Sequence, residues 1–187
     1  WQWHKKCVVN FFHTKEMPVL DITKEQLEFL VNETVNEGLT VPGVQKKLSL
    51  HLSSDIDARL TIVDYPTGYI LKPQTEEFEN MPEFEDLAMR LAEIMGIQTV
   101  PHALIKMNGE YAYITKRIDR EITEKEIKLY AMEDFCQLSC RLTQDKYKGS
   151  YEQCGRIIKK YSTTPGLDMS ELFLRVLGSF VMGNSDM

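Results

Sequence analysis

The sequence predicts an α+β fold in two lobes, with a strand-rich front and a helical back. Short segments rich in β-branched and aromatic residues occur up to about residue 116, and a strong helical pattern at 81–96 is embedded among them. Beyond residue 130 only helical periodicity remains. Strands collected in one part of a chain and helices in the other are typical of α+β proteins with two lobes.

The front begins with a helix whose two ends are both marked. In "DITKEQLEFLVNETVNEG", Thr23 and Gln26 form a capping-box pair, and Gly38 ends the segment. Three short strands are predicted next, in "KLSLHL", "RLTIVDY" and "GYILKP". The alternating leucines of the first strand indicate that one of its faces is buried.

The segment "MPEFEDLAMRLAEIMG" predicts the next helix. Pro82 suits a first turn and Gly96 suits a terminator. Its apolar stripe is predicted from residues at helical spacing: Phe84, Leu87, Ala88, Leu91 and Met95. A hairpin follows in "HALIKMNGEYAYITKRIDR", because Asn108-Gly109 is a favoured two-residue turn between β-rich arms.

Three segments of the back predict helices: "AMEDFCQLSCRL", "SYEQCGRIIKKY" and "DMSELFLRVLGSFV". Asp168 and Glu171 form a capping box that predicts the start of the last one. The hinge between the lobes is expected near "ITKRIDR". The predicted organisation is a terminal segment (1–20), an N-lobe (21–116) and a C-lobe fragment (117–187).

Composition excludes several classes of protein. With 28 acidic and 22 basic residues the net charge is −6, which disfavours direct binding to nucleic acid. No apolar run reaches the length of a membrane span, and the first residues lack a signal-peptide layout. The four scattered cysteines fit a reducing compartment, so a cytoplasmic location without membrane attachment is expected.

Candidate chemistry occurs at four places along the chain. The loop "VPGVQKK" carries a glycine and two lysines, although taken alone a surface turn with solvated lysines is the favoured interpretation. Lys72 ends an apolar strand, where an ammonium can meet phosphates or can simply extend to solvent. Glu85 follows in the next helix at the spacing of a kinase lysine–glutamate pair, and Asp186 follows the last helix.

These motifs together resemble the HipA-like serine/threonine kinases, the toxins of bacterial toxin–antitoxin modules. The resemblance extends over nearly the whole chain, through "VPGVQKKLSLHL", "GYILKP", "FEDLAMRLAEIMGI", "ITKRIDR", "MEDFCQL", "DKYKGSYE" and "GNSDM". It implies a protein-kinase-like bilobal fold and transfer of the ATP γ-phosphate to serine or threonine of a protein. A translation enzyme such as an aminoacyl-tRNA synthetase is the implied substrate, and an antitoxin is the implied partner.

The resemblance also implies roles for particular residues. Asp186 is the expected catalytic base, in the position of the aspartate of the family's "GN-[ST]-D-x-H-x-K-N" motif. The residues expected to bind ATP comprise a phosphate loop, the strand lysine with its glutamate, and the adenine-holding hinge: Gly43, Val44, Gln45, Lys46, Lys47, Lys72, Glu85, Thr115, Lys116, Arg117 and Ile118. Thr40 matches the family's regulatory autophosphorylated serine, although a polar residue before a Pro-Gly turn is the simpler interpretation.

The same comparison leads us to expect a fragment. The sequence ends inside the implied catalytic loop, so the Mg²⁺ ligands of the family are expected after residue 187. No Mg²⁺ ligand is expected within residues 1–187. Residues 1–187 alone are therefore expected to be inactive. His4 and Cys7 resemble the end of a cysteine-rich segment, but two residues do not close a zinc site, and a chance pairing is preferred. The alternative function is a non-catalytic module that binds nucleotide or an antitoxin.

Overall fold

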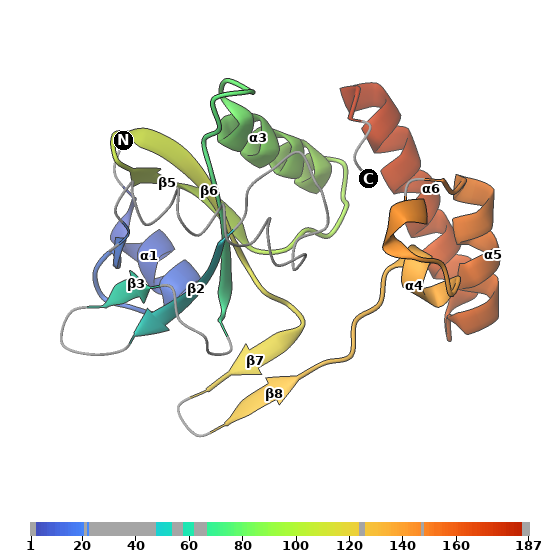
Figure 1. The fold of residues 1–187 in the computed structure, drawn as a ribbon, viewed down its shortest axis with the longest axis horizontal. Coiled ribbons are helices and arrows are strands. Elements are labelled where there is room, and N and C mark those ends of the chain that lie inside the picture. Colours follow the sequence, from blue (N-terminus) through green and yellow to red (C-terminus); the bar gives the residue numbers. More distant parts are fainter. Residues whose placement is uncertain are drawn as a thin grey trace. The chain divides into compact units, whose positions relative to one another are not determined.

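The computed structural model describes residues 3–20, 22, 48–53, 58–61, 67–123, 126–146 and 148–184. The chain forms two compact units (Figure 1). Unit 1 contains residues 1–87 and 100–130, and unit 2 contains residues 88–99 and 131–187. The division after residue 130 differs from the hinge near 116 that the sequence suggested, because the strands following that hinge remain with unit 1.

Unit 1 is built on a sheet of six strands in the order β1-β3-β2-β4-β6-β5. The strands are β1 (Val19–Leu20), β2 (Leu48–Ser53), β3 (Arg59–Thr61), β4 (Tyr69–Pro73), β5 (His102–Met107) and β6 (Glu110–Lys116). All neighbouring pairs are antiparallel except β1 with β3. The sequence correctly predicted β2 to β6, and their ends lie within a few residues of the expected ones.

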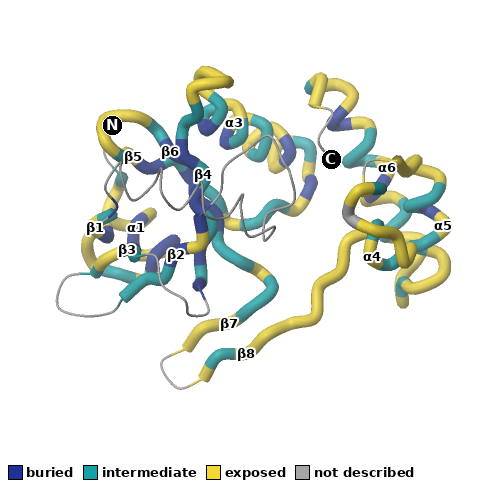
Figure 2. Tube along the Cα trace, in the orientation of Figure 1, coloured by how far each residue is buried: buried dark blue, intermediate teal, exposed yellow. Residues whose placement is uncertain are grey.

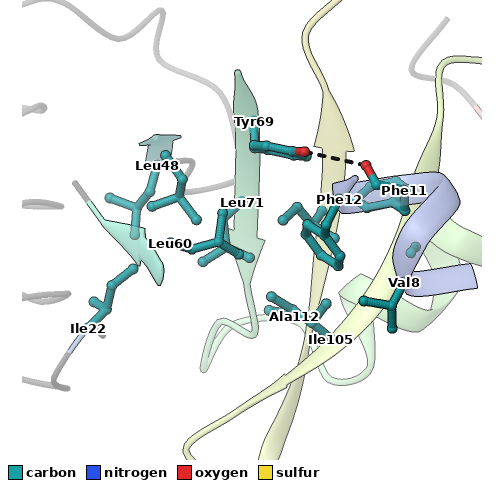
Figure 3. Packing of buried hydrophobic residues seen from close by; sticks show 13 residues of the cluster. Val8, Phe11, Phe12, Ile22, Leu48, Leu60, Tyr69, Leu71, Ile105 and Ala112 are labelled. Atoms are coloured by element: carbon teal, nitrogen blue, oxygen red, sulfur yellow. Dashed lines mark hydrogen bonds between the residues drawn. The ribbon is translucent and has the colours of Figure 1, made fainter. Parts of the chain in front are cut away.

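One face of this sheet forms the core of unit 1 (Figure 3). Leu71 of β4 pairs with Leu48 of β2 and with Ile114 of β6, and all three side chains are buried. Successive residues of a strand point to opposite faces. The buried face therefore takes every second residue, and the residues between them, such as Lys72, point to the other face.

Helix α1 (Lys5–Phe12) covers the buried face, and the sequence analysis missed it. Its Val8, Phe11 and Phe12 lie at helical spacing and are all buried, whereas its polar residues are mostly exposed. Phe11 and Phe12 contact each other edge to face, with ring centroids 4.8 Å apart. The helix is short and has no side-chain cap, so the i, i+3, i+4 spacing of its apolar residues was the only available signal.

Two hairpins complete unit 1. The predicted turn between β5 and β6 is present, with φ of 51° at Asn108 and 91° at Gly109, the left-handed values that such turns require. The second hairpin joins β7 (Arg120–Ile122) to β8 (Ile127–Leu129) and was not predicted. It is largely exposed (Figure 2), so its side chains have no strong apolar alternation to reveal it.

Helix α3 (Met81–Ile94) has the predicted ends, but its predicted apolar stripe is wrong. Phe84, Leu87 and Leu91 are exposed, whereas Asp86 and Ala92 are buried. The helix turns a partly polar side toward the sheet because Glu85 and Asp86 find partners there. Gly96 follows with φ of 80°, as a terminating glycine should.

Unit 2 contains α4 (Phe135–Leu138), a 3₁₀ turn (Thr143–Asp145), α5 (Tyr151–Tyr161) and α6 (Pro165–Met182). Glycines let these helices pack closely. A Cβ on Gly155 of α5 would lie 3.2 Å from the Met169 terminal methyl, and one on Gly178 of α6 would lie 3.0 Å from that of Met95. The segment after α3 is therefore packed against α6.

The start of α6 corrects another prediction. The helix begins at Pro165 after Thr164, so Asp168 lies in its first turn and does not cap it. Asp168 instead accepts a hydrogen bond from the Ser162 hydroxyl at 2.6 Å. A capping box does occur at α4, where Asp134 and Gln137 exchange side-chain-to-backbone hydrogen bonds.

The four cysteines are all free thiols. In the described part of the chain, no helix combines the length and the apolar character needed to cross a membrane.

Candidate functional site

Lys72 lies near the end of β4, on the sheet face opposite the α1-covered core. Its side chain is 27% exposed, so the stem is packed while the ammonium remains within reach of solvent. The ammonium lies 5.6 Å from the ring centroid of Tyr113, its register partner on β6. A lysine held in this way can present its charge to an anionic ligand.

The ammonium of Lys72 forms an ion pair with the carboxylate of Glu85, as the sequence analysis expected. Glu85 belongs to α3, thirteen residues further along the chain, and its side chain is 23% exposed. The structure therefore brings these two predicted site residues together. Their role in binding ATP remains a prediction.

A second contact of α3 lies beside the first. Asp86 Oδ1 lies 3.0 Å from His102 Nδ1 of β5, and the two side chains are only 8% and 4% exposed. The His102 ring stacks on Tyr113 with centroids 5.9 Å apart. The sequence analysis missed this pair because a polar contact between a helix and a strand leaves no pattern in the sequence.

The predicted adenine-holding segment, 115–118, is the end of β6 and the residues after it. Its backbone is already engaged at two points. The Lys116 N–H donates to the Pro101 carbonyl at 3.0 Å, and the Arg117 N–H donates to the Gly68 carbonyl at 2.9 Å. A base held by this segment would therefore use its other backbone groups, such as those of Ile118, unless the strand rearranges.

Thr115 is buried and Lys116 is half-buried at the end of the same strand. The Lys116 ammonium lies 3.0 Å from His13 Nε2 and above the Phe11 ring. Burial lowers the pKa of Lys116. Lys116 pairs with Tyr69, a residue of the core face, so its side chain points away from the face that carries Lys72.

Asp119 organises the residues just after this segment. Its carboxylate accepts paired hydrogen bonds from the guanidinium groups of Arg117 and Arg120, with the shortest at 2.7 Å and 2.8 Å. These hydrogen bonds hold the pKa of Asp119 far below its usual range. The "RIDR" spacing was noted only as a motif, although arginines two residues before and one after an aspartate could have suggested the cluster.

The remaining predicted site residues lie outside the described residues. They are the phosphate loop (Gly43, Val44, Gln45, Lys46 and Lys47), the regulatory candidate Thr40 and the catalytic candidate Asp186. Helix α6 ends at Met182, and its C-cap residue Gly183 has φ of 67°. Within the described ranges, no group of three or more histidine, cysteine, aspartate or glutamate side chains could hold a metal ion.

Comparison with known proteins assigns the chain to a family. The sequence model of the HipA-like C-terminal domain matches residues 39–187, which is most of the chain. The chain belongs to the HipA-like C-terminal domain family. The match includes the phosphate loop, Lys72, Glu85 and Asp186, and it confirms the resemblance inferred from the motifs.

The relatives of this HipA-like domain include several candidate kinases. One from Haemophilus influenzae is 24% identical over 184 residues, covering 91% of this chain and 51% of the relative. The candidate kinase Y4mE of Sinorhizobium fredii is 28% identical over 153 residues, covering 79% of this chain and 36% of the relative. The chain therefore spans about half or less of the length of these relatives.

A solved structure confirms the fold class. The HipA-like chain superposes with a TM-score of 0.63 on a chain from the Shewanella oneidensis complex of HipA, HipB and operator DNA. The match covers 79% of this chain and 38% of that one, at 21% identity. The fold is accordingly α+β and similar to that of the HipA kinases.

Proposed function

We propose that residues 1–187 contain the nucleotide-binding part of a protein kinase that transfers the ATP γ-phosphate to serine or threonine. The observation that carries the proposal is the partly exposed ion pair between Lys72 and Glu85, on the sheet face opposite the α1-covered core. Family membership and the candidate kinases among the relatives support the reaction class. Asp186 would orient the substrate hydroxyl and accept its proton.

The residues around Lys72 fit an anionic nucleotide. The ammonium is accessible, and Glu85 and the Tyr113 ring restrict its direction, so it can meet a phosphate with little loss of side-chain freedom. ATP would supply the phosphoryl group, and Mg²⁺ would neutralise charge on it. We assign no Mg²⁺ ligand among residues 1–187, because family precedent places these ligands after Asp186.

The protein substrate is proposed from family precedent alone. A translation enzyme such as an aminoacyl-tRNA synthetase is the expected class. Radiolabelled phosphate transfer by a longer protein containing these residues, tested on a panel of synthetases, would identify it. Labelling of a single synthetase at serine or threonine would support the proposal, and labelling of small molecules alone would contradict it.

The structural neighbour favours a second function, the binding of an antitoxin. The matched Shewanella oneidensis protein was solved in a complex with HipB and operator DNA. We propose an antitoxin-like protein as a partner, and we propose no direct contact of this chain with nucleic acid because its net charge is −6. Co-purification with the product of a neighbouring gene, in the absence and presence of DNA, would separate the two contacts.

Calorimetry of ATP binding by residues 1–187 tests the nucleotide site. Lys72→Met should weaken ATP binding by roughly ten- to a hundredfold, the usual effect of losing a charge-assisted contact. Lys106→Met is the matched control, because Lys106 of β5 also lies 5.6 Å from the ring of its register partner, Tyr111. Equal affinity of wild type and Lys72→Met would contradict the proposal.

An activity assay shows whether residues 1–187 transfer phosphate or only bind the nucleotide. We propose that the polypeptide 1–187 binds ATP without transferring its phosphate, since electrostatic stabilisation by metal carries much of this reaction. Labelled ATP, Mg²⁺ and a general protein substrate provide the assay. Robust transfer by this polypeptide would show that the active site has been misplaced.

A further inference from the structure

Helix α3 contacts the sheet through two consecutive acidic residues that reach different strands. Glu85 pairs with Lys72 of β4, and Asp86 pairs with His102 of β5. Consecutive residues of a helix point about 100° apart, so one helix can direct them to two separate partners. The two strands flank β6, which places the contacts roughly two strand spacings apart.

Two contacts at this separation restrain the helix in a way that one contact cannot. An ion pair at Glu85 alone fixes the polar side of α3 at one point, and the buried Pro82 and Ala92 add only non-directional packing. A second contact on the far side of β6 opposes pivoting of the helix about that point. The Asp86–His102 pair therefore adds a second directional restraint on α3, next to Glu85.

Tyr113 of β6 connects the two contacts. Its ring lies 5.6 Å from the Lys72 ammonium and stacks at 5.9 Å on the His102 ring. The residue is only 1% exposed, so the ring cannot move away without opening the unit. Tyr113 pairs in register with Lys72 of β4 and with Leu104 of β5, so His102 lies diagonally from it, two residues along β5. The Tyr113 ring thus links Lys72 and His102, the two partners of the acidic pair of α3.

The two pairs differ in their access to a ligand. The side chains of Lys72 and Glu85 are about one-quarter exposed, whereas those of His102 and Asp86 are nearly buried. A nucleotide can therefore contact Lys72 but cannot contact His102. Any influence of His102 on nucleotide binding must act through the position of α3 and of Lys72.

We propose that Asp86 and His102 are positioning residues, which fix α3 so that Glu85 directs the Lys72 ammonium toward the phosphates of a nucleotide. The proposal rests on the nucleotide-binding function proposed above. It goes beyond that function because it assigns a role to two residues that cannot touch the ligand. It requires that loss of the buried pair affects phosphate recognition and leaves recognition of the nucleoside unchanged.

The test compares the affinities of ATP and adenosine in residues 1–187 by calorimetry. His102→Leu should bind ATP about tenfold more weakly and adenosine as tightly as the wild type does. His102→Asn keeps an N–H donor close to the position of Nδ1 and should restore most of the ATP affinity. A role limited to stability would weaken both ligands equally, and that result would overturn the proposal.

Thr99→Val, just after α3, is the matched control for a contact of the same helix. The Thr99 hydroxyl donates to Glu93 of α3 at 2.9 Å at an exposed position, so this variant removes a hydrogen bond of α3 in which no strand residue takes part. It should leave both affinities unchanged. If His102→Leu does not fold, Asp86→Ser removes the same contact with a smaller change, and it must show the same ATP-specific loss.

A double variant separates failure of this proposal from failure of the proposed function. If the pair acts through Lys72, His102→Leu should have no further effect on ATP affinity in the Lys72→Met background. Additive losses would overturn the positioning role. If Lys72→Met alone leaves ATP affinity unchanged, the nucleotide site itself is wrong. If Lys72→Met weakens ATP binding but His102→Leu does not, the nucleotide site is supported and the positioning role is wrong.

Discussion

At the scale of single residues, Tyr69 is held in the core of unit 1 by its ring and by its hydroxyl. Its ring packs against both Phe11 and Phe12, and its hydroxyl donates to the Phe11 carbonyl at 3.3 Å (Figure 3). Burial raises the pKa of Tyr69 to about 12. The folded protein therefore favours the protonated phenol more strongly than the unfolded chain does.

This shift predicts a stability change in alkali. The contribution of Tyr69 is fully present below the unfolded pKa of about 10, and it is lost as the pH rises toward about 12. Tyr69→Phe should cost about 1 kcal/mol at pH 7 through the lost hydrogen bond. Urea denaturation at pH 8 and pH 11 should show that the difference from wild type shrinks in alkali. A difference independent of pH would contradict the assignment.

The contribution of Asp119 to stability has the opposite dependence on pH. Because Arg117 and Arg120 depress its pKa, its stabilising effect is present above about pH 4 and is lost as the pH falls further. Asp119→Asn should destabilise the protein by about 1 kcal/mol at pH 7, a value that allows for partial exposure to solvent. Thermal unfolding at pH 7 and pH 3 checks this. Asp145→Asn, at an exposed Lys148 pair, is the control and should change little.

Residue patterns predicted the pair Lys72 and Glu85 but not its buried neighbour. A lysine at a strand end and a glutamate in the following helix stand in a recognisable order along the chain. Asp86 and His102 are joined by tertiary packing alone. Lys116 lies in the expected segment, but register with Tyr69 turns its side chain to the core face.

At the scale of elements, two glycines differ in backbone conformation, so replacing each by alanine should change the stability in opposite directions. Gly96 has φ of 80° after α3, so Gly96→Ala should destabilise the protein by about 1 kcal/mol. Gly166 lies in α6, and among the described residues nothing approaches its Cβ position within 4 Å. Gly166→Ala should stabilise by about 0.5–1 kcal/mol. Chemical denaturation of both variants tests the pair, and effects of the same sign would contradict the backbone assignment.

Among the described elements, those with strong local signals were predicted well, and those without them were missed. The β5–β6 hairpin has its Asn-Gly turn, and α3 has a proline in its first turn and a glycine after its end. Helix α1 and the β7–β8 hairpin lack such signals, and tertiary contacts decide them. The stripe of α3 was misjudged because apolar periodicity cannot anticipate ion pairs on the other side of a helix.

At the scale of the whole molecule, α6 presents apolar residues on two sides. Leu172, Gly178 and Ser179 are buried within unit 2, whereas Phe173 and Phe180 are 68% and 82% exposed. The exposed pair is seven residues apart and so lies on one side of the helix. Large exposed aromatic side chains that share one face favour association.

We therefore predict that residues 1–187 self-associate with rising concentration, and that Phe173→Glu combined with Phe180→Glu reduces this without unfolding the protein. The physical reason is that the two carboxylates replace apolar area at solvent-exposed positions and add negative charge to a chain that already carries −6.

Sedimentation velocity at several concentrations measures the association, and circular dichroism measures the fold. Leu172→Glu is the matched control, because the same change at a side chain that is only 9% exposed should unfold unit 2. A wild-type chain that remains monomeric at all concentrations would contradict the prediction, since the exposed face of α6 would then make no contribution to association.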